Sequence, residues 1–296
     1  MKKRAQKFTG KPGLKGKSPG KKENNPANRK RLSRSKPKST PPDYDFKSLK
    51  SRVSTANDNP DSTIRLNRYI ANAGVCSRRE ADKLIAAGEI MVNGKIVSEL
   101  GYKVNPTDKI KYKGKILARE KFVYVLLNKP KDFITTTDDP ENRQTVMKLV
   151  AKACDERIYP VGRLDRNTTG LLLFTNDGDL AKKLSHPSHN VKKIYQVELD
   201  RSLQKEDFLK IHEGLELEDG PVKVDDFAIL SDDRKTIGVE IHLGRNRIVR
   251  RLFEHLNYEV IKLDRVVYAG LTKKDLKRGN WRYLTQKEVI KLKYLK

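Results

Sequence analysis

Regular spacing of apolar residues along the chain begins at Ile64. Leu66, Ile70 and Ala73 fall on one face of a helix, and Gly74 can adopt the left-handed conformation that commonly ends one. The pattern therefore predicts a short helix directly after Ile64.

A second helix and a hairpin are predicted next. Ser77 and Glu80 have the spacing of a capping box, in which each side chain bonds the backbone N–H of the other residue. Ala81 and Ile85 then face inward. The stretch EIMVNGKIV, residues 89–97, has two short apolar segments on either side of Asn-Gly, which is a strong signal for a β-hairpin.

From Phe122 onward, apolar stretches typical of strands alternate irregularly with stretches of helical periodicity. The predicted strands are residues 122–130, 170–176, 193–199, 222–230 and 235–243. The predicted helices are residues 179–185, 205–212, 247–256 and 287–295, the last opened by a second capping box at 285–288. Because no regular strand–helix–strand repeat is present, we predict an α+β fold with a mixed, largely antiparallel sheet.

The segment before these elements has a different composition. Residues 1–60 are rich in Lys, Ser, Pro, Gly and Asn and hold almost no large apolar side chains, so we predict a disordered basic tail. A phosphate-binding role and a merely solvated extension are equally compatible with it. The domain prediction is thus a tail (1–60), a small domain (61–120) and a larger α+β domain (121–296).

The net charge indicates a polyanionic partner. The chain of 296 residues has 64 Lys and Arg against 38 Asp and Glu, a formal charge of +26. The tail holds 18 of these basic residues and 4 of the acidic ones, so the remainder of the chain is basic as well. Nucleic acid fits such a surface better than a membrane, because no helix pairs a basic face with a broad aromatic one.

Other classes of protein are disfavoured by what the sequence lacks. It has no run of about 18 apolar residues and no apolar segment after its basic start, so we expect a cytoplasmic protein without a membrane span or secretory signal. Its two cysteines and five histidines lack the spacing of metal ligands, and no nucleotide-binding glycine motif occurs. We therefore expect a monomer that uses no metal and no cofactor.

Basic residues gather on the predicted helix pair. Arg78 and Arg79 lie in the first turn of the second helix, where the N–H groups and the helix dipole favour phosphate. Arg65, Arg68 and Lys83 lie nearby in the sequence, and we predict that all five bind RNA. The alternative is a solvated helical hairpin whose charges only aid solubility.

Residues 64–117 resemble the S4-like RNA-binding domain. The resemblance is carried by Arg65-Leu66, Tyr69-Ile70, Ser77-Arg78, Ala81, Ile85, Gly88 and Val92-Asn93-Gly94. It implies a small RNA-binding domain built from an αα-hairpin and β-strands, without fixing the chemistry of the domain that follows.

The stretch GRLDRNTTGLLLFTNDG, residues 162–178, places Asp165 between Arg163 and Arg166, just before a predicted buried strand. Nearby cations keep a carboxylate ionised, which suits a nucleophile or a base. If the residue stood alone, an aspartate that only bonds its own turn backbone would be the favoured interpretation.

This stretch resembles the active-site motif of pseudouridine synthases, in the branch of ribosomal RNA enzymes that carry an S4-like domain. LNKPKDFITTTDDP resembles the first motif of that family, and GRNRIVRR followed by LDRVVYAGL resembles its last. The resemblance covers the chain from Ile64 almost to its end. One departure is Ile248, where relatives generally carry Gln or Glu.

The resemblance implies roles for four residues. Asp165 would be the nucleophile or base at the sugar, and Tyr195 would lie against the uracil. Arg250 would pair with Asp165 and keep it ionised. Arg163 would fill the space left when the uridine is flipped out of its stack. The chemistry is a redox-neutral rearrangement and requires no cofactor.

The expected partner is ribosomal RNA, free or in an assembling subunit, with Arg245 and Arg247 as further RNA contacts. GRNRIVRRLFEHL and the segment 278–282 look most like the large-subunit branch. Two alternatives stay open, namely the same chemistry on small-subunit RNA and a non-catalytic RNA-binding assembly factor.

Overall fold

The structure is a computed structural model that describes residues 40–44 and 63–295. The predicted disordered tail therefore lies outside the described residues, except for 40–44. There Tyr44 is buried, its ring lies edge-on to Tyr124 with centroids 5.0 Å apart, and its hydroxyl donates to the Leu284 carbonyl at 2.9 Å. The prediction of disorder does not hold for this short segment, because Tyr44 packs against the core.

A small α/β module follows and contains the two predicted helices, α1 (Leu66–Asn72) and α2 (Arg78–Ala86). Its short strands are β1 (Ile64–Arg65), β2 (Ile90–Val92), β3 (Lys95–Ile96), β4 (Lys103–Val104), β5 (Ile110–Tyr112) and β6 (Lys115–Ile116). Strand β1 pairs with β4, and the other four form a sheet in the order β3-β2-β5-β6. Both helices pack on this module's own apolar core.

The local signals in this module produce the expected geometry. Ser77 Oγ accepts from the Glu80 N–H at 3.2 Å, and the Glu80 carboxylate accepts from the Ser77 N–H at 2.8 Å. Asn93 and Gly94 both have positive φ, as the tight turn between β2 and β3 requires. The capping box and the hairpin are confirmed.

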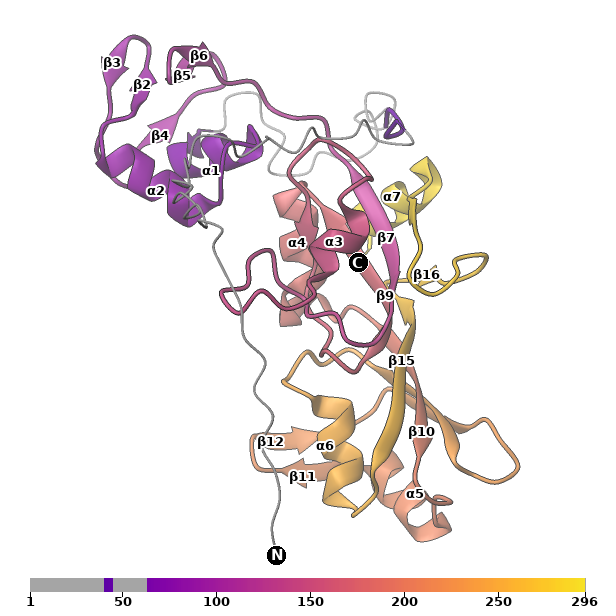
Figure 1. The fold of residues 1–296 in the computed structure, drawn as a ribbon. Coiled ribbons are helices and arrows are strands. Elements are labelled where there is room, and N and C mark those ends of the chain that lie inside the picture. The colour runs from indigo at the N-terminus through magenta and orange to yellow at the C-terminus, as the bar shows by residue number, and fades with distance from the viewer. Residues whose placement is uncertain (1–39, 45–62, 296) are drawn as a thin grey trace, which may run out of the picture. The chain divides into compact units, whose positions relative to one another are not determined.

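The larger part of the chain is organised around one sheet, which has nine strands within the described residues (Figure 1). The main path is β13-β14-β10-β15-β9-β7-β17, while β16 pairs with β15 and β8 with β9. The bounds are β7 (Tyr124–Lys129), β8 (Tyr159–Pro160), β9 (Thr169–Thr175), β10 (Lys193–Leu199), β13 (Asp226–Ile229), β14 (Thr236–Ile241), β15 (Val260–Tyr268), β16 (Leu271–Thr272) and β17 (Trp281–Tyr283). The β15–β9 pair is parallel and the other pairs of this sheet are antiparallel, so the mixed, largely antiparallel α+β prediction is confirmed.

The helices of this part complete the apolar cores. They are α3 (Val146–Val150), α4 (Gly178–Ser185), the 3-10 turn η2 (Pro187–His189), α5 (Lys205–Glu213), α6 (Ile248–His255) and α7 (Gln286–Lys293). Alternate residues of β7 and β9 point to opposite faces, so one face packs against α4 and α7 and the other against α3. A further core joins α6 and α5 to strands β10, β14 and β15.

Two features differ from the sequence-based expectation. Of the predicted strand 222–230, only residues 226–229 form a strand of the main sheet (β13), because Val222 ends β12 (Gly220–Val222), which pairs with β11 (Leu215–Leu217) outside that sheet. The nine-residue strand β15 was not among the predicted strands, although it lies at the centre of the sheet between β10 and β9. Its register brings Arg265 opposite both Tyr195 of β10 and Gly170 of β9.

Candidate active site

The turn that carries Asp165 lies directly before β9 and is fixed by its backbone. Leu164 is buried, and its carbonyl accepts from Thr135 Oγ1 at 2.8 Å. The Asp165 carbonyl accepts from the Thr168 N–H at 3.1 Å, and Thr168 is itself buried. The Asp165 side chain remains 41% exposed. A rigid turn therefore presents a carboxylate that solvent can reach.

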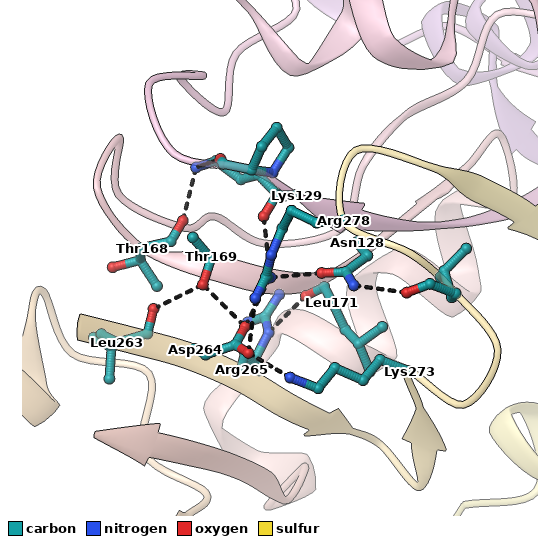
Figure 2. Close-up of polar contacts among 12 residues, drawn as sticks. Asn128, Lys129, Thr168, Thr169, Leu171, Leu263, Asp264, Arg265, Lys273 and Arg278 are labelled. Atoms are coloured by element: carbon teal, nitrogen blue, oxygen red, sulfur yellow. Dashed lines mark hydrogen bonds and ion pairs between the residues drawn. The ribbon is translucent and has the colours of Figure 1, made fainter. Parts of the chain in front are cut away.

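A buried lysine from β7 holds this turn from beneath. Lys129 has no exposed surface, and its Nζ donates to the carbonyl oxygens of Asp165 at 3.0 Å, Arg166 at 3.1 Å and Thr168 at 2.8 Å. A fourth carbonyl, that of Pro130, lies 3.1 Å away. Figure 2 shows the bond from Lys129 to the Thr168 carbonyl. One ammonium group thus gathers the carbonyls on both sides of the candidate carboxylate.

The Lys129 ammonium is less stable than an exposed one. Burial lowers its pKa to about 8, although the negative charges of Asp165 and Asp132 act in the opposite direction. This lysine was not among the predicted site residues. Its position at the end of a wholly buried strand was the available signal, since a lysine in such a place requires hydrogen-bond acceptors.

The cation nearest to the Asp165 carboxylate comes from the start of α6. Arg247 Nη1 lies 3.9 Å from Asp165 Oδ2, and both side chains are partly exposed. Arg247 Nη2 also donates to the Glu254 carboxylate at 3.1 Å. Arg247 is the N-cap residue of α6, and its backbone is in the left-handed conformation. The structure thus brings Arg247, predicted as an RNA contact, to the carboxylate.

The predicted ion pair between Arg250 and Asp165 is not formed among the described residues. The Arg250 guanidinium is turned toward β15, where its Nη1 donates to the Val260 carbonyl at 2.8 Å. Burial lowers the pKa of Arg250 and the charge of Arg247 adds to this effect, while Asp165 opposes it. Arg250 therefore lies close enough to Asp165 to sense its charge, without contacting it.

Tyr195 lies on β10 at the level of this turn. It pairs with Arg265 of β15, which in turn pairs with Gly170 of β9. With about 4.8 Å between neighbouring strands, Tyr195 and Gly170 are roughly 10 Å apart across the sheet. The half-buried Tyr195 ring packs against the α6-side core and against the α3-side core. It therefore lies at the boundary between the two.

The predicted RNA-binding residues lie in two places. Arg163 is exposed beside Asp165, while Arg245 near α6 bonds the Gly220 carbonyl at 3.0 Å and faces Asp219. The other set surrounds α1 and α2: Arg65, Arg68, Arg78, Arg79 and Lys83. Arg68 forms an ion pair with Asp179, and Arg78 Nη2 lies 3.5 Å from Asn67 Oδ1. The side chains of Arg65, Arg78, Arg79 and Lys83 are exposed.

A polar network lies on the other face of the central strands (Figure 2). Asp264 accepts hydrogen bonds from Arg278, Lys273 and Thr169. Burial acts to raise its pKa, but the bonds from Arg278 and Lys273 lower it to about 2. Arg278 also donates to Asn128 Oδ1 at 2.6 Å, which ties the C-terminal loop to β7.

A pocket of about 260 Å³ adjoins this network and is lined by residues that include Lys131, Gln196 and Arg278. Gln196 follows Tyr195 on β10, so its side chain points to the opposite face of the sheet. The pocket therefore lies on the face of β10 opposite to Tyr195, and its Arg278 and Asp264 already form an ion pair.

Neither a metal cluster nor a membrane span is found in the described part of the chain. Residues 40–44 and 63–295 contain no group of three or more His, Cys, Asp or Glu placed to hold a metal ion. No helix within those ranges has both the length and the apolar character needed to cross a bilayer. What the site offers is an exposed, rigidly held carboxylate beside arginines and a tyrosine.

Comparison with known families matches both parts of the chain. Residues 123–255 match the family model described as RNA pseudouridylate synthase, and residues 64–110 match the S4 domain. Over 235 residues the chain is 45% identical to ribosomal large subunit pseudouridine synthase B of Bacillus subtilis, covering 78% of this chain and 96% of that protein.

Two further similarities extend over comparable lengths. The chain is 34% identical to a dual-specificity RNA pseudouridine synthase of Escherichia coli, with 79% of each protein covered. A crystal structure of a pseudouridylate synthase superposes with a TM-score of 0.56 at 30% identity, covering 77% of this chain and 99% of the other.

Proposed function

The chain belongs to the RNA pseudouridine synthase family, and we propose that it converts a specific uridine of ribosomal RNA to pseudouridine with Asp165 as the essential carboxylate. The observation that carries this proposal is the turn before β9. Three of its carbonyls accept hydrogen bonds from the buried Lys129, which fixes the backbone, while the Asp165 side chain stays accessible. An aspartate that served only its own turn would accept a backbone N–H with its carboxylate, and no such bond to Asp165 is formed among the described residues.

The reaction suits this arrangement. Uridine becomes pseudouridine when the N1–C1′ bond breaks, the base turns, and C5 bonds to C1′. An ionised carboxylate can attack C1′, attack the base or remove a sugar proton. The Arg247 guanidinium lies 3.9 Å from this carboxylate. The proposal holds for each of these three routes.

We assign the other predicted residues around this carboxylate. Tyr195, at the boundary of two apolar cores, would contact the uracil face. Arg250, whose guanidinium donates to the Val260 carbonyl, would influence Asp165 through its positive charge at a distance rather than through a direct ion pair. Arg163, exposed in the same turn, would occupy the space vacated by the flipped nucleotide.

RNA binding is divided between two parts of the chain in this proposal. Residues 61–120 would form the S4-like RNA-binding domain and residues 121–296 the catalytic domain. The exposed Arg65, Arg78, Arg79 and Lys83 would hold phosphates at a fixed distance from the reacting uridine.

Large-subunit ribosomal RNA is the substrate that we propose. The Bacillus subtilis relative, 45% identical, is named for the large ribosomal subunit. The Escherichia coli relative, 34% identical, is named as a dual-specificity enzyme, so small-subunit RNA or a second RNA is the alternative.

Mapping of pseudouridines across ribosomal RNA, in cells with and without the gene, tests the proposal. Loss of one site in large-subunit RNA, restored by the wild-type gene but not by Asp165→Asn, is the expected result. Loss of a site in small-subunit RNA would overturn the substrate assignment. An unchanged pseudouridine map would favour a non-catalytic assembly factor.

A further inference from the structure

Four side chains from two central strands form a compact group behind the candidate site. Lys193 and Tyr195 belong to β10, and Arg265 and Tyr268 to β15; we call these four residues the central cluster. Lys193 lies opposite Tyr268, and Tyr195 opposite Arg265. The register shift between Ile194 and Tyr195 brings Arg265 and Tyr268 together despite their spacing, with the Arg265 Cζ 4.4 Å from the centre of the Tyr268 ring.

Arg265 is a buried cation that lacks a full set of partners. Only 3% of its surface is exposed. Its Nε donates to the Leu171 carbonyl at 2.8 Å, but its Nη2 is buried without any hydrogen-bond partner. No ion pair to Arg265 is formed among residues 40–44 and 63–295, and an arginine cannot discard its charge. A buried charge without a counter-ion is expensive, and stacking on Tyr268 offsets only part of this.

A second cation lies beside it. Lys193 Nζ donates to the His242 carbonyl, and no carboxylate within the described ranges pairs with it. Burial lowers the pKa of Lys193 to about 8, the positive charge of Arg265 adds to this effect, and Asp225 opposes it. The Asp225 carboxylate is itself 2.7 Å from His242 Nδ1. The two cations therefore concentrate positive charge in the centre of the sheet.

The position of this charge relates it to the reaction. Tyr195, which we propose to contact the uracil, belongs to the central cluster and pairs with Arg265. Arg265 also pairs with Gly170, five residues after Asp165 and at the base of its turn. The two cations are thus next to the place proposed for the uracil, at the level of the sheet where the Asp165 turn leads into β9.

We propose that Arg265 and Lys193 stabilise the detached uracil as an anion. When N1–C1′ breaks, both electrons of the bond leave with the base and spread over N1, O2 and O4. C1′ receives a replacement bond from Asp165, or the sugar loses its 2′ proton. C5 then bonds to C1′ as the Asp165 carboxylate leaves C1′ or, in the second case, as C2′ regains its proton. C5 gives up its proton and N1 takes one, so atoms and electrons balance. The inference rests on the proposed function, through the two routes that release the base, namely attack on C1′ or loss of the 2′ proton.

Arg265 acts in this proposal as a positioning residue, through its charge and its place opposite Tyr195. Fixed charge aimed at a developing anion in a dry site is a large source of rate enhancement. In the protein alone the buried Arg265 Nη2 has no hydrogen-bond partner among the described residues. The anion that forms during the reaction then supplies the missing counter-charge.

A comparison of two RNA fragments tests this. Each carries the uridine found by the mapping experiment, and in one that uridine is replaced by 5-fluorouridine. Fluorine withdraws electrons and stabilises the base anion without help from the protein. Single-turnover consumption of the target nucleoside is measured for wild type and Arg265→Gln. On uridine RNA we expect the variant to be slower by about 100-fold or more, and on 5-fluorouridine RNA by about 10-fold or less.

Lys193→Gln provides a second reading, because Lys193 is only partly buried and the variant is expected to fold even if Arg265→Gln does not. We expect Lys193→Gln also to lose more rate on uridine RNA than on 5-fluorouridine RNA, by a smaller factor than Arg265→Gln. Lys262→Gln is the matched control, since Lys262 is exposed on β15 and pairs with Glu198; its rates should match wild type on both RNAs. Thermal unfolding identifies any variant that is not folded.

The outcomes separate this inference from the proposed function. A wild-type protein that forms no pseudouridine in the uridine fragment refutes the proposed function. An active wild type whose folded Arg265→Gln or Lys193→Gln variant loses equal rate on the two RNAs refutes only the inference, because a purely structural role would slow both alike.

Discussion

Replacing the buried Lys129 with methionine tests how much the lysine contributes to holding the Asp165 turn, without changing the Asp165 carboxylate itself. Methionine is close to lysine in length, and its flexible thioether can fill the same space without a charge. The substitution removes the donor to the carbonyls of Asp165, Arg166 and Thr168. Because Lys129 has no exposed surface, the change leaves the RNA-facing surface intact.

The expected magnitude follows from these contacts. Leaving one buried carbonyl unsatisfied costs about 1–3 kcal/mol. Part of that cost is offset, because Lys129→Met no longer buries an ammonium whose pKa is lowered to about 8. We expect a net loss of about 2–4 kcal/mol in the free energy of unfolding. A displacement of the turn by about 1 Å should lower the rate of pseudouridine formation by about 100-fold.

Chemical denaturation and single-turnover kinetics on a ribosomal RNA fragment measure both effects. RNA affinity should change little. Lys131→Met is the control, since Lys131 is exposed two residues further along the chain and its replacement should leave stability nearly unchanged. Wild-type stability and rate in Lys129→Met would show that the lysine does not hold the turn.

Three further predictions concern other parts of the chain. In Gly170→Ala the new Cβ would lie 2.3 Å from the Arg265 carbonyl oxygen. The free energy of unfolding should therefore fall by more than about 3 kcal/mol, and unaltered stability would refute the packing described here. Arg78→Ala combined with Arg79→Ala should raise the RNA concentration needed for half-maximal rate at every salt concentration. The slope of log affinity against log salt concentration should become shallower by about one unit for each lost phosphate contact, and wild-type binding would refute this. Between pH 8 and 10.5, Lys129 keeps its proton in the unfolded chain but has released it in the native protein. The free energy of unfolding of the wild type should therefore rise with pH more steeply than that of Lys129→Met, by about 1 kcal/mol per pH unit. Parallel pH profiles of these two proteins would contradict that assignment.

Local signals predicted the elements that local physics determines. The capping box of Ser77 and Glu80 and the turn at Asn93 and Gly94 need only residues that are adjacent in the sequence. The buried strand after Asp165 was equally visible, since an apolar run bounded by turn residues has few other interpretations.

Long-range contacts account for what the sequence did not predict. Strand β15 contains Lys262, Asp264 and Arg265, which break the apolar pattern. These charges are tolerated in the central strand because residues distant in sequence neutralise or bond them, as Arg278 does for Asp264. The direction of the Arg250 guanidinium likewise depends on the Val260 carbonyl, whose position only the folded sheet determines.

The same limit applies to Lys129. Its place in the resembling motif LNKPK was evident, but its four acceptor carbonyls come from two loops that meet only in the folded protein. Proximity of Arg247 to Asp165 is also a product of the tertiary structure, since the two residues are 82 positions apart in the sequence.

The central claim is that Asp165 performs the chemistry of pseudouridine formation, and the purified Asp165→Asn variant tests it most directly. Asparagine is almost isosteric but is neither a nucleophile nor a base at neutral pH. Wild type and variant are compared for pseudouridine formed in a large-subunit ribosomal RNA fragment, with Asp132→Asn as the control in a neighbouring exposed loop. We expect Asp165→Asn to bind the RNA nearly as wild type does and to react slower by more than about 1,000-fold, while Asp132→Asn stays active. Turnover by folded Asp165→Asn at a substantial fraction of the wild-type rate would contradict the account.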